Sequence, residues 1–262
     1  MRRRKRFGQH FLHDPAVIAH IVAALEVRAG DHLVEIGPGR GALTRALLAR
    51  RDCTCDAIEI DRDLAAALRV MFAAVPGARL HQADALDFDF RALAAARGGK
   101  LRIVGNLPYN ISTPLLFHLL DAADAITDLH VMLQREVVAR LAAAPGSSDY
   151  GRLTVMLAPR VAAQKLFDIG PGAFQPPPRV WSAVVRLTVR AAPLFPVSAH
   201  YAAVVAAAFS ARRKTLRNAL APLLSAAEIG ACGVDPAARP GTLTPQQFNE
   251  LARALDRAGR SR

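Results

Sequence analysis

The sequence predicts an α/β protein with a doubly wound, mostly parallel sheet, followed by a small all-helical domain. Short apolar runs rich in β-branched residues alternate with helical patterns in the first part of the chain, the order that builds a parallel sheet with helices on both faces. A glycine-rich turn follows the first of these runs, as is typical of ligand-binding sheets of this kind. From about residue 198 only helical patterns remain. We therefore expect two domains, residues 1–195 and 196–262.

Each element of the first domain has a local signal. Asp14 followed by Pro15 is typical of an N-cap and a first helical position, and predicts a helix through about Glu26. The apolar runs predict strands at 32–36, 55–60, 78–84, 101–106 and 128–134. A helix is expected after the last of these strands, through about Ala144.

Two further strands are expected at 163–169 and 180–189, on either side of a proline-rich segment at 170–180. Proline interrupts helices and central strands, so this segment is predicted to be a stiff loop whose hairpin closes one end of the sheet. In the second domain, helical patterns cover 200–220, 225–232 and 244–259, and Thr244 with Gln247 forms a capping box at the last of them.

Composition and charge favour a polyanionic partner. Lys and Arg number 34 against 22 Asp and Glu, a formal net charge of +12, and cations that neutralise phosphates release counterions. We expect nucleic-acid contacts from two basic clusters: Arg3, Arg4, Lys5, Arg6, Arg212, Arg213, Lys214 and Arg217. No long uncharged apolar run and no secretory h-region are present, so neither a membrane span nor secretion is expected. The three cysteines lack metal-ligand spacing, and no metal is expected.

Glycines and carboxylates gather at the carboxyl ends of the first three expected strands. Gly37, Gly39 and Gly41 follow the first strand, where glycine lets the backbone and the helix N-terminus approach a ligand closely. Glu59 ends the second strand and Asp84 the third. There, one carboxylate can accept both ribose hydroxyls of a nucleoside and the other an adenine amino proton.

The spacing of the glycine turn favours one nucleoside over another. Gly37-Pro38-Gly39-Arg40-Gly41 departs from the pattern of dinucleotide sites, and Glu35 adds a negative charge just before it. S-adenosylmethionine, with its sulfonium and α-amino group, fits these features better than a nicotinamide dinucleotide does. The dinucleotide is the alternative that these residues leave open.

Asn106, Pro108 and Tyr109 follow the fourth expected strand, on the same edge of the sheet. An exocyclic amine on a nucleobase is a poor nucleophile because its lone pair is delocalised. The side-chain oxygen of Asn106 and the backbone carbonyl of Pro108 are candidate acceptors that hold such an amine. Tyr109 offers a face on which the base stacks after it has left its own stack.

The motifs, taken in order, resemble those of the ribosomal RNA adenine N6-dimethyltransferases, most closely the bacterial 16S (small-subunit) group. The matching segments are FGQHFL (7–12), VEIGPGRGALT (34–44), EID (59–61), QADAL (82–86), NLPYNIS (106–112), LQREVVAR (133–140) and FQPPPRVWSAVVRL (174–187). The resemblance covers nearly the whole chain and implies a Rossmann-like class I S-adenosylmethionine-dependent methyltransferase domain with a helical RNA- and ribosome-binding domain behind it.

The resemblance also implies roles for single residues. Cofactor contacts are expected at His10, Leu12, Gly37, Gly39, Glu59, Ile60, Asp84, Ala85 and Asn106. Phe174 is expected to cover the face of the target adenine opposite Tyr109. One departure is His10, where asparagine is commoner in the family.

The implied reaction is the S-adenosylmethionine-dependent dimethylation of two adjacent adenosines in the 3′-terminal hairpin loop of 16S rRNA, with S-adenosylhomocysteine as product. The partner is the small (30S) subunit or its late precursor, and a cytoplasmic monomer with a role in subunit biogenesis is expected. Three alternatives stay open: a dimethyltransferase of large-subunit rRNA, a DNA adenine methyltransferase, for which NLPY is the poorer match, and a non-catalytic assembly factor.

Overall fold

A computed structural model describes residues 10–259 of the chain. The strands are β1 Phe11–Leu12, β2 His32–Ile36, β3 Thr54–Glu59, β4 Arg79–Gln82, β5 Leu101–Asn106, β6 Ile126–Gln134, β7 Val161–Ile169, β8 Phe174–Gln175 and β9 Ser182–Val189. The helices are α1 Pro15–Ala24, α2 Ala42–Leu48, α3 Arg62–Ala73, α4 Phe90–Arg97, α5 Ser112–Asp121, α6 Arg135–Leu141, α7 Arg152–Leu157, α8 Tyr201–Ser210, α9 Leu216–Ala219, α10 Ala226–Ala231 and α11 Pro245–Arg257, with 3₁₀ turns η2 Ala123–Ala125, η3 Pro171–Ala173 and η4 Pro240–Thr242.

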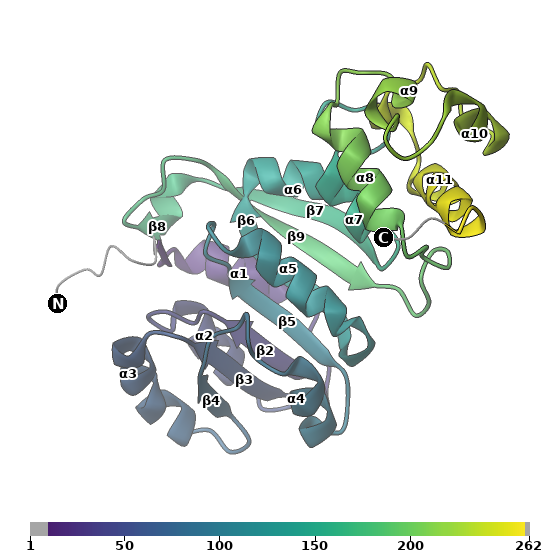
Figure 1. Cartoon of the computed structure of the whole chain (residues 1–262). Coiled ribbons are helices and arrows are strands. Elements are labelled where there is room, and N and C mark those ends of the chain that lie inside the picture. Colours follow the sequence, from purple (N-terminus) through teal and green to yellow (C-terminus); the bar gives the residue numbers. More distant parts are fainter. Residues whose placement is uncertain (1–9, 260–262) are drawn as a thin grey trace. The chain divides into compact units, whose positions relative to one another are not determined.

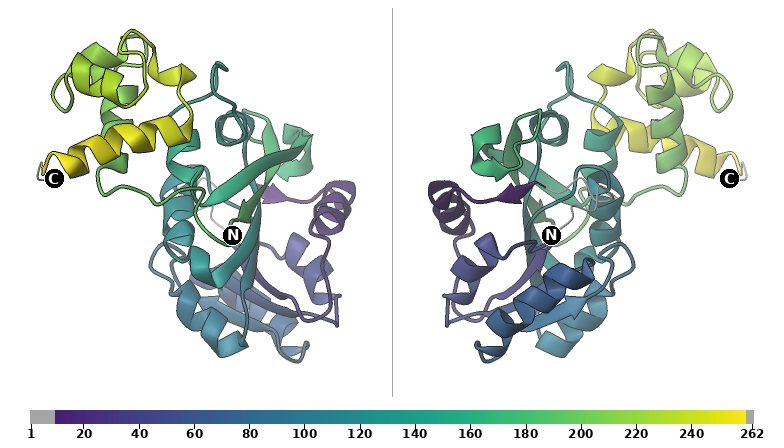
Figure 2. Two further views of the ribbon diagram at one scale, coloured as in Figure 1. Left: turned by 90° about the vertical axis from the view of Figure 1, so that its right-hand side faces the viewer. Right: turned by 90° about the vertical axis from the view of Figure 1, so that its left-hand side faces the viewer.

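The described residues form a seven-stranded sheet in the order β4-β3-β2-β5-β6-β9-β7. The strands from β4 to β6 are parallel, and β9 runs antiparallel to β6. Helices α1 and α2 cover one face of the sheet and α5 the other, as Figures 1 and 2 show. The chain leaves β2 in one direction towards β3 and returns on its other side as β5. This reversal creates a crevice at the carboxyl ends of these strands.

The predicted helix starts are confirmed. The Asp14 side chain accepts the Ala16 and Val17 amides at 2.8 and 3.2 Å, which caps α1, and the capping box of Thr244 and Gln247 begins α11. Such bonds satisfy amides that have no partner within the helix. The strands β1 and β8, of two residues each, pair antiparallel, and Leu12 lies opposite Phe174.

Packing divides the chain into two units: the residues up to Val138 with Gln164–Val189, and Ala139–Ala163 with the residues from Arg190 onward. This corrects the expected boundary at residue 195, because 139–163 joins the second unit and not the first. The reason is a shared apolar core, in which Tyr150 and Val155 pack with the second unit's helices. The Tyr150 hydroxyl also donates to the Leu243 carbonyl at 2.7 Å.

The helix expected at 200–220 is instead two helices, α8 and α9, joined by a turn at 211–214. The amides of Leu216 and Arg217 bond to the carbonyls of Ala238 and Pro236, at 2.9 and 3.0 Å, and not to the preceding turn. The chain therefore breaks there and starts a new helix. Among the described residues, no helix is both long and apolar enough to span a membrane.

Candidate active site

The glycine turn after β2 adopts backbone angles that favour glycine. Gly37, Gly39 and Gly41 have φ values of +69°, +57° and +76°, a region that side chains with a Cβ rarely adopt. A Cβ on Gly39 would also lie 3.0 Å from the ring of Phe11. The turn therefore needs glycine at the point where Phe11 of β1 packs against it.

Glu59, at the end of β3, ties this turn to the next strand. Its carboxylate is 3% exposed and accepts the amides of Gly39 and Asp61 at 3.1 and 2.9 Å, one on each oxygen. Burial raises the pKa of Glu59, and these backbone hydrogen bonds oppose the rise. Each oxygen has a further lone pair, so the carboxylate can still accept a pair of ligand hydroxyls.

Asp84 lies beyond the end of β4, where its carboxylate accepts the amide of Leu86 at 2.9 Å. This bond fixes the turn after the strand. Ala85 beside it is buried, whereas Ile60 leaves 45% of its surface exposed at the pocket wall. An exposed isoleucine next to acidic groups offers a flat apolar surface to a planar ligand.

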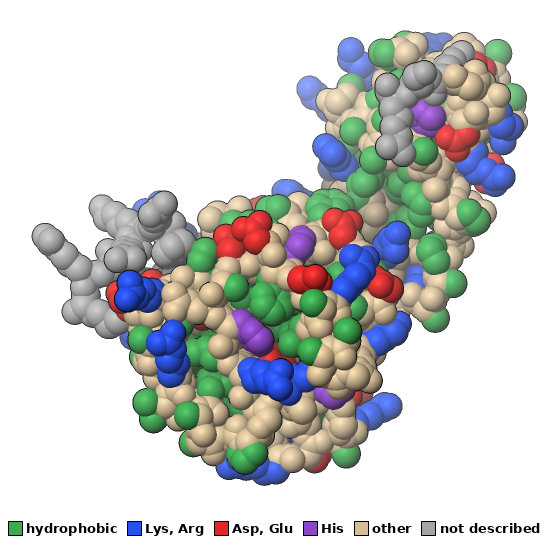
Figure 3. Space-filling model, turned by 60° about the horizontal axis from the view of Figure 1, so that its bottom comes forward, with side chains coloured by type: hydrophobic (Ala, Val, Ile, Leu, Met, Phe, Trp, Pro, Cys, Tyr) green, Lys and Arg blue, Asp and Glu red, His purple; other side chains and the backbone are tan. Residues whose placement is uncertain are grey.

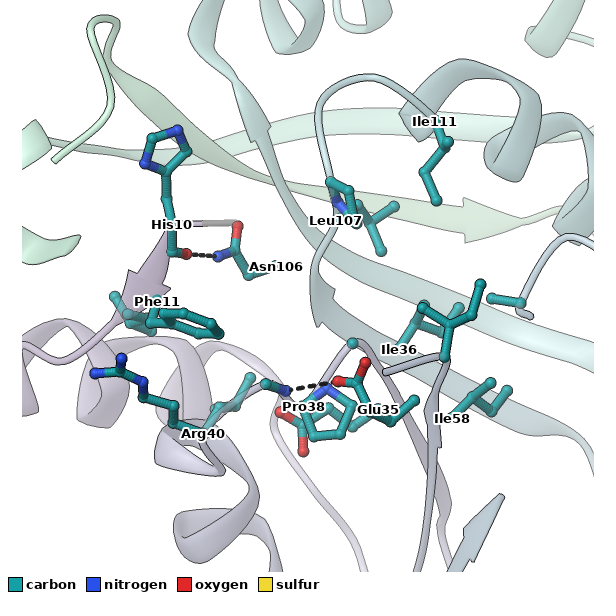
Figure 4. A pocket seen from close by; sticks show the side chains of 18 of the residues that line it. His10, Phe11, Glu35, Ile36, Pro38, Arg40, Ile58, Asn106, Leu107 and Ile111 are labelled. Carbon is teal, nitrogen blue, oxygen red and sulfur yellow. Dashed lines mark hydrogen bonds between the residues drawn. The ribbon is translucent and has the colours of Figure 1, made fainter. Parts of the chain in front are cut away.

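Asn106 ends β5, and its amide is oriented by the segment that precedes α1. The side-chain nitrogen donates to the backbone carbonyl of His10 at 2.9 Å. A carbonyl only accepts hydrogen bonds, so the group facing it must be the NH₂ of the amide. The amide oxygen of Asn106 is therefore the atom that this bond leaves available, as Figure 4 shows.

His10 makes a second link through its ring. Its Nδ1 lies 2.8 Å from the carbonyl oxygen of Pro176, so this nitrogen is the one that carries the proton. His10 thereby links the proline-rich segment, through its ring, to Asn106, through its backbone carbonyl. This contact gives the departure from the commoner asparagine a structural explanation.

Pro108 and Tyr109 occupy the turn after Asn106. The Pro108 carbonyl accepts the amide of Ile111 at 3.2 Å and keeps one lone pair for another donor. The Tyr109 hydroxyl lies 2.7 Å from that of Ser182 on β9, and burial raises the pKa of the phenol. The hydroxyl is thus anchored while the ring lines the pocket.

Glu35, inside β2, is the most unusual group in this pocket. It is 2% exposed, and its Oε2 has no hydrogen-bond partner among residues 10–259. Burial raises its pKa from 4.5 to about 7, and the charge of Glu59 contributes. Hydrogen bonding from the Thr44 side chain opposes this rise in pKa. A buried carboxylate with an oxygen left unpaired is costly when ionised, so this group favours a cationic ligand.

These groups line a single cavity of about 280 Å³. Eleven of the residues expected at the site line it: His10, Leu12, Gly37, Gly39, Glu59, Ile60, Asp84, Ala85, Asn106, Pro108 and Tyr109. Sequence reasoning missed Phe11 and Arg40, which also line it, with the Arg40 guanidinium 4.6 Å from the centre of the Phe11 ring.

Phe174 does not lie where it was expected. It is 1% exposed, packs in the core of the first unit with Leu12 and Val184, and is absent from the pocket lining. Pairing of β8 with β1 buries its side chain between the sheet and the N-terminal segment. The expected contact with the face of a bound adenine is therefore not available in this conformation.

Comparison with known proteins identifies the family. Residues 1–257 match the family described as "Ribosomal RNA adenine dimethylase". The proteins named "Ribosomal RNA small subunit methyltransferase A" from Pseudomonas aeruginosa and Methylococcus capsulatus are 53% and 54% identical to this chain. The first match covers 97% of this chain and 95% of the relative, and the second covers 97% and 98%. This chain belongs to the ribosomal RNA adenine dimethylase family.

Solved structures agree on the fold of this dimethylase. The 23S rRNA methyltransferase ErmE has a TM-score of 0.72 and 29% identity, covering 94% of this chain and 99% of its own. A dimethyladenosine transferase from Plasmodium falciparum has a TM-score of 0.81 and 22% identity, covering 95% and 98%. The dimethylase is thus a class I methyltransferase with a Rossmann-like sheet, and S-adenosylmethionine is its methyl donor.

The pocket of the dimethylase fits this donor. Glu59 has free lone pairs for two hydroxyls, and the buried carboxyl of Glu35, which also lines the pocket, favours a positively charged ligand. A pyrophosphate would be repelled by two carboxylates so near the turn. These features favour S-adenosylmethionine over the nicotinamide dinucleotide that the sequence left open.

The expected RNA contacts are described only in part. Arg3, Arg4, Lys5 and Arg6 lie outside the described residues. Arg212, Arg213, Lys214 and Arg217 are all exposed, on the turn between α8 and α9 and on α9 itself. Arg212 also donates to the carbonyls of Ser147 and Ser148. Basic side chains are spread over the face shown in Figure 3, with acidic ones among them.

Proposed function

We propose that this dimethylase transfers methyl groups from S-adenosylmethionine to N6 of two adjacent adenosines in the 3′-terminal hairpin loop of 16S rRNA. Four transfers complete the two residues, and S-adenosylhomocysteine is released each time. The substrate is the small ribosomal subunit or its late precursor. Two relatives that are more than 50% identical to this chain are named as methyltransferases of the small-subunit ribosomal RNA, which supports this choice of rRNA.

The orientation of Asn106 carries the proposal. Its NH₂ is held by the His10 carbonyl, so its oxygen is the group available to a ligand. The Pro108 carbonyl, two residues on, has a lone pair to spare. An adenine amine placed between these two acceptors donates both of its N–H bonds, which fixes the nitrogen and favours the pyramidal geometry of a nucleophile.

The same two acceptors position the amine, so no general base is needed before methyl transfer. The N–C bond forms as the S–C bond breaks, and the extra proton on the nitrogen then leaves to water. When bound, the donor supplies an already activated methyl group on a positively charged sulfur. Tyr109 holds the flipped base by stacking, worth about 1–3 kcal/mol, and its anchored hydroxyl limits movement of the ring. After the first methyl transfer one N–H remains, so one acceptor still orients the nitrogen for the second.

Exposed cationic side chains are proposed to bind the subunit. Arg213, Lys214 and Arg217 are proposed to contact rRNA phosphates, together with the basic N-terminal cluster Arg3–Arg6. Such contacts do not depend on sequence, and they give the dimethylase a grip on the subunit beyond the target loop. We further propose that it acts as a cytoplasmic monomer during maturation of the small subunit.

A large-subunit substrate is the second candidate, because the fold of ErmE covers nearly the whole chain. The decisive experiment incubates the protein with labelled S-adenosylmethionine and either unmethylated small subunits or large subunits, followed by nucleoside analysis. N6,N6-dimethyladenosine in 16S rRNA alone is expected. Label in 23S rRNA, or none in either, contradicts the proposal.

Asn106→Ala tests the role of the amide in methyl transfer separately from binding to the subunit. The variant removes the amide oxygen without touching the exposed cations, so it should lose methyl transfer while its affinity for small subunits stays within a few-fold. Normal turnover in this variant would remove the proposed role of Asn106.

A further inference from the structure

Trp181 is a large aromatic side chain left half exposed beside the pocket. It is the only tryptophan of the chain and is 49% exposed, next to Val180 at 43%. It directly precedes β9, whose first residue, Ser182, is fully buried and contacts the Tyr109 hydroxyl at 2.7 Å. Trp181 is therefore the chain neighbour of the residue that anchors the base-stacking ring, with its Cα about 3.8 Å from that of Ser182.

The indole is held in place by its neighbours. The backbone carbonyl of Trp181 accepts the amide of Arg135 at 2.9 Å, and the Arg135 guanidinium carbon lies 5.7 Å from the indole centre. On another side, ring atoms come within 3.7 Å of the place where a side chain on Gly170 would begin. The ring is therefore positioned by packing while half of its surface faces solvent.

Arg135 lies against this indole, and Arg179 stands two residues before it in the chain. Arg135 and Arg179 are exposed, and a guanidinium beside an indole presents two planar groups of the kind that stack on bases. An anionic chain with planar bases matches this combination of charge and shape. A neutral protein surface would match only the apolar part.

From these contacts we infer that Trp181 and Arg135 form a stacking platform for the nucleobase next to the target adenosine in the same RNA strand. The inference rests on the proposed function, since it concerns a second subsite of that substrate. Moving one base into the pocket removes the stacking partner of its neighbour. The platform replaces that partner, and so it holds the second adenosine of the pair while the first is methylated.

The single tryptophan provides a direct readout. The full-length protein, saturated with S-adenosylhomocysteine, is titrated with a synthetic RNA hairpin that has two adjacent adenosines in its loop. Binding is followed separately through a dye at the end of the RNA. A base stacked on the indole should quench its fluorescence with the same midpoint as binding. Saturated binding with unchanged indole fluorescence overturns the inference.

Substitution gives an independent test on small subunits. Trp181→Ala should raise the KM for subunits between about fivefold and 150-fold, the range expected for one stacked base, and leave the affinity for S-adenosylmethionine unchanged. Trp181→Phe keeps a stacking face and should restore most of the loss. Val70→Ala is the control, because it trims a side chain 79% exposed on α3 and should change neither quantity.

The outcomes separate the platform from the reaction. If the wild-type protein does not methylate small subunits, the proposed function fails. If it does and Trp181→Ala has the wild-type KM, only the platform fails. If Trp181→Ala loses cofactor affinity as well, Trp181→Phe decides: a wild-type KM there supports a stacking face, and a KM as high as that of the alanine variant rejects it.

Discussion

Replacing Glu35 by glutamine should change how the stability of this dimethylase depends on pH. The pKa of the buried carboxyl is raised from 4.5 to about 7. Below pH 4.5 the group is protonated in both the folded and the unfolded chain and adds no pH dependence. Between pH 4.5 and 7 the unfolded chain releases the proton and the folded chain retains it, so the free energy of unfolding falls as pH rises.

The size of this effect follows from the same two values. At 1.36 kcal/mol per pH unit, the wild-type protein should lose roughly 3 kcal/mol relative to Glu35→Gln between pH 4.5 and pH 7. Above pH 7 the difference should be constant. The swap also changes hydrogen bonding, but that contribution is independent of pH, so only the change in the difference is interpreted.

The assay is urea unfolding of both proteins at half-unit steps from pH 4.5 to 8.5, followed by circular dichroism. A second readout is calorimetry of S-adenosylmethionine binding near pH 6.5 in two buffers of different ionisation enthalpy. A cation beside Glu35 lowers its pKa, so binding to the wild type should release a proton that the glutamine variant does not. A stability difference that is flat across this pH range would refute the reasoning.

Three further changes test separate parts of the structure. Gly105→Ala would place a Cβ 2.4 Å from the Ile36 carbonyl, so it should force β5 from β2, lower thermal stability and reduce methyl transfer; a variant as stable as wild type contradicts the geometry. Phe174→Leu should have a KM for subunits within a few-fold of the wild-type value. A large rise in KM at unchanged stability would show that Phe174 contacts the adenine after all. Arg213→Glu with Lys214→Glu should weaken subunit binding and flatten its salt dependence, measured by filter binding; an unchanged salt slope would exclude this surface.

The strand ends of the site were predictable from the sequence. Parallel strands bring their carboxyl ends to one edge, so locating the ends of β3 and β5 was enough to bring Glu59 and Asn106 together. Asp84 was expected to end its strand, whereas β4 ends at Gln82 and Asp84 follows two residues later on the same edge. The glycine turn carried its own signal, because glycine adopts the positive φ angles found at Gly37 and Gly39 far more readily than other residues do.

Contacts between distant segments could not be predicted in this way. The bond from His10 to Pro176 joins residues 166 positions apart, and the strands β1 and β8 contain two residues each, too few for a periodic pattern. The burial of Phe174 depends on that pairing. The transfer of 139–163 to the second unit likewise depends on where Tyr150 packs, which no local pattern encodes.

The most direct test is a crystal structure of the protein with S-adenosylhomocysteine and an adenosine nucleotide in the pocket. The account predicts the adenine ring stacked on Tyr109, with its exocyclic nitrogen within hydrogen-bond distance of both the Asn106 side-chain oxygen and the Pro108 carbonyl. An amide oxygen of Asn106 turned towards the protein interior, or an adenine bound away from Tyr109, would contradict it.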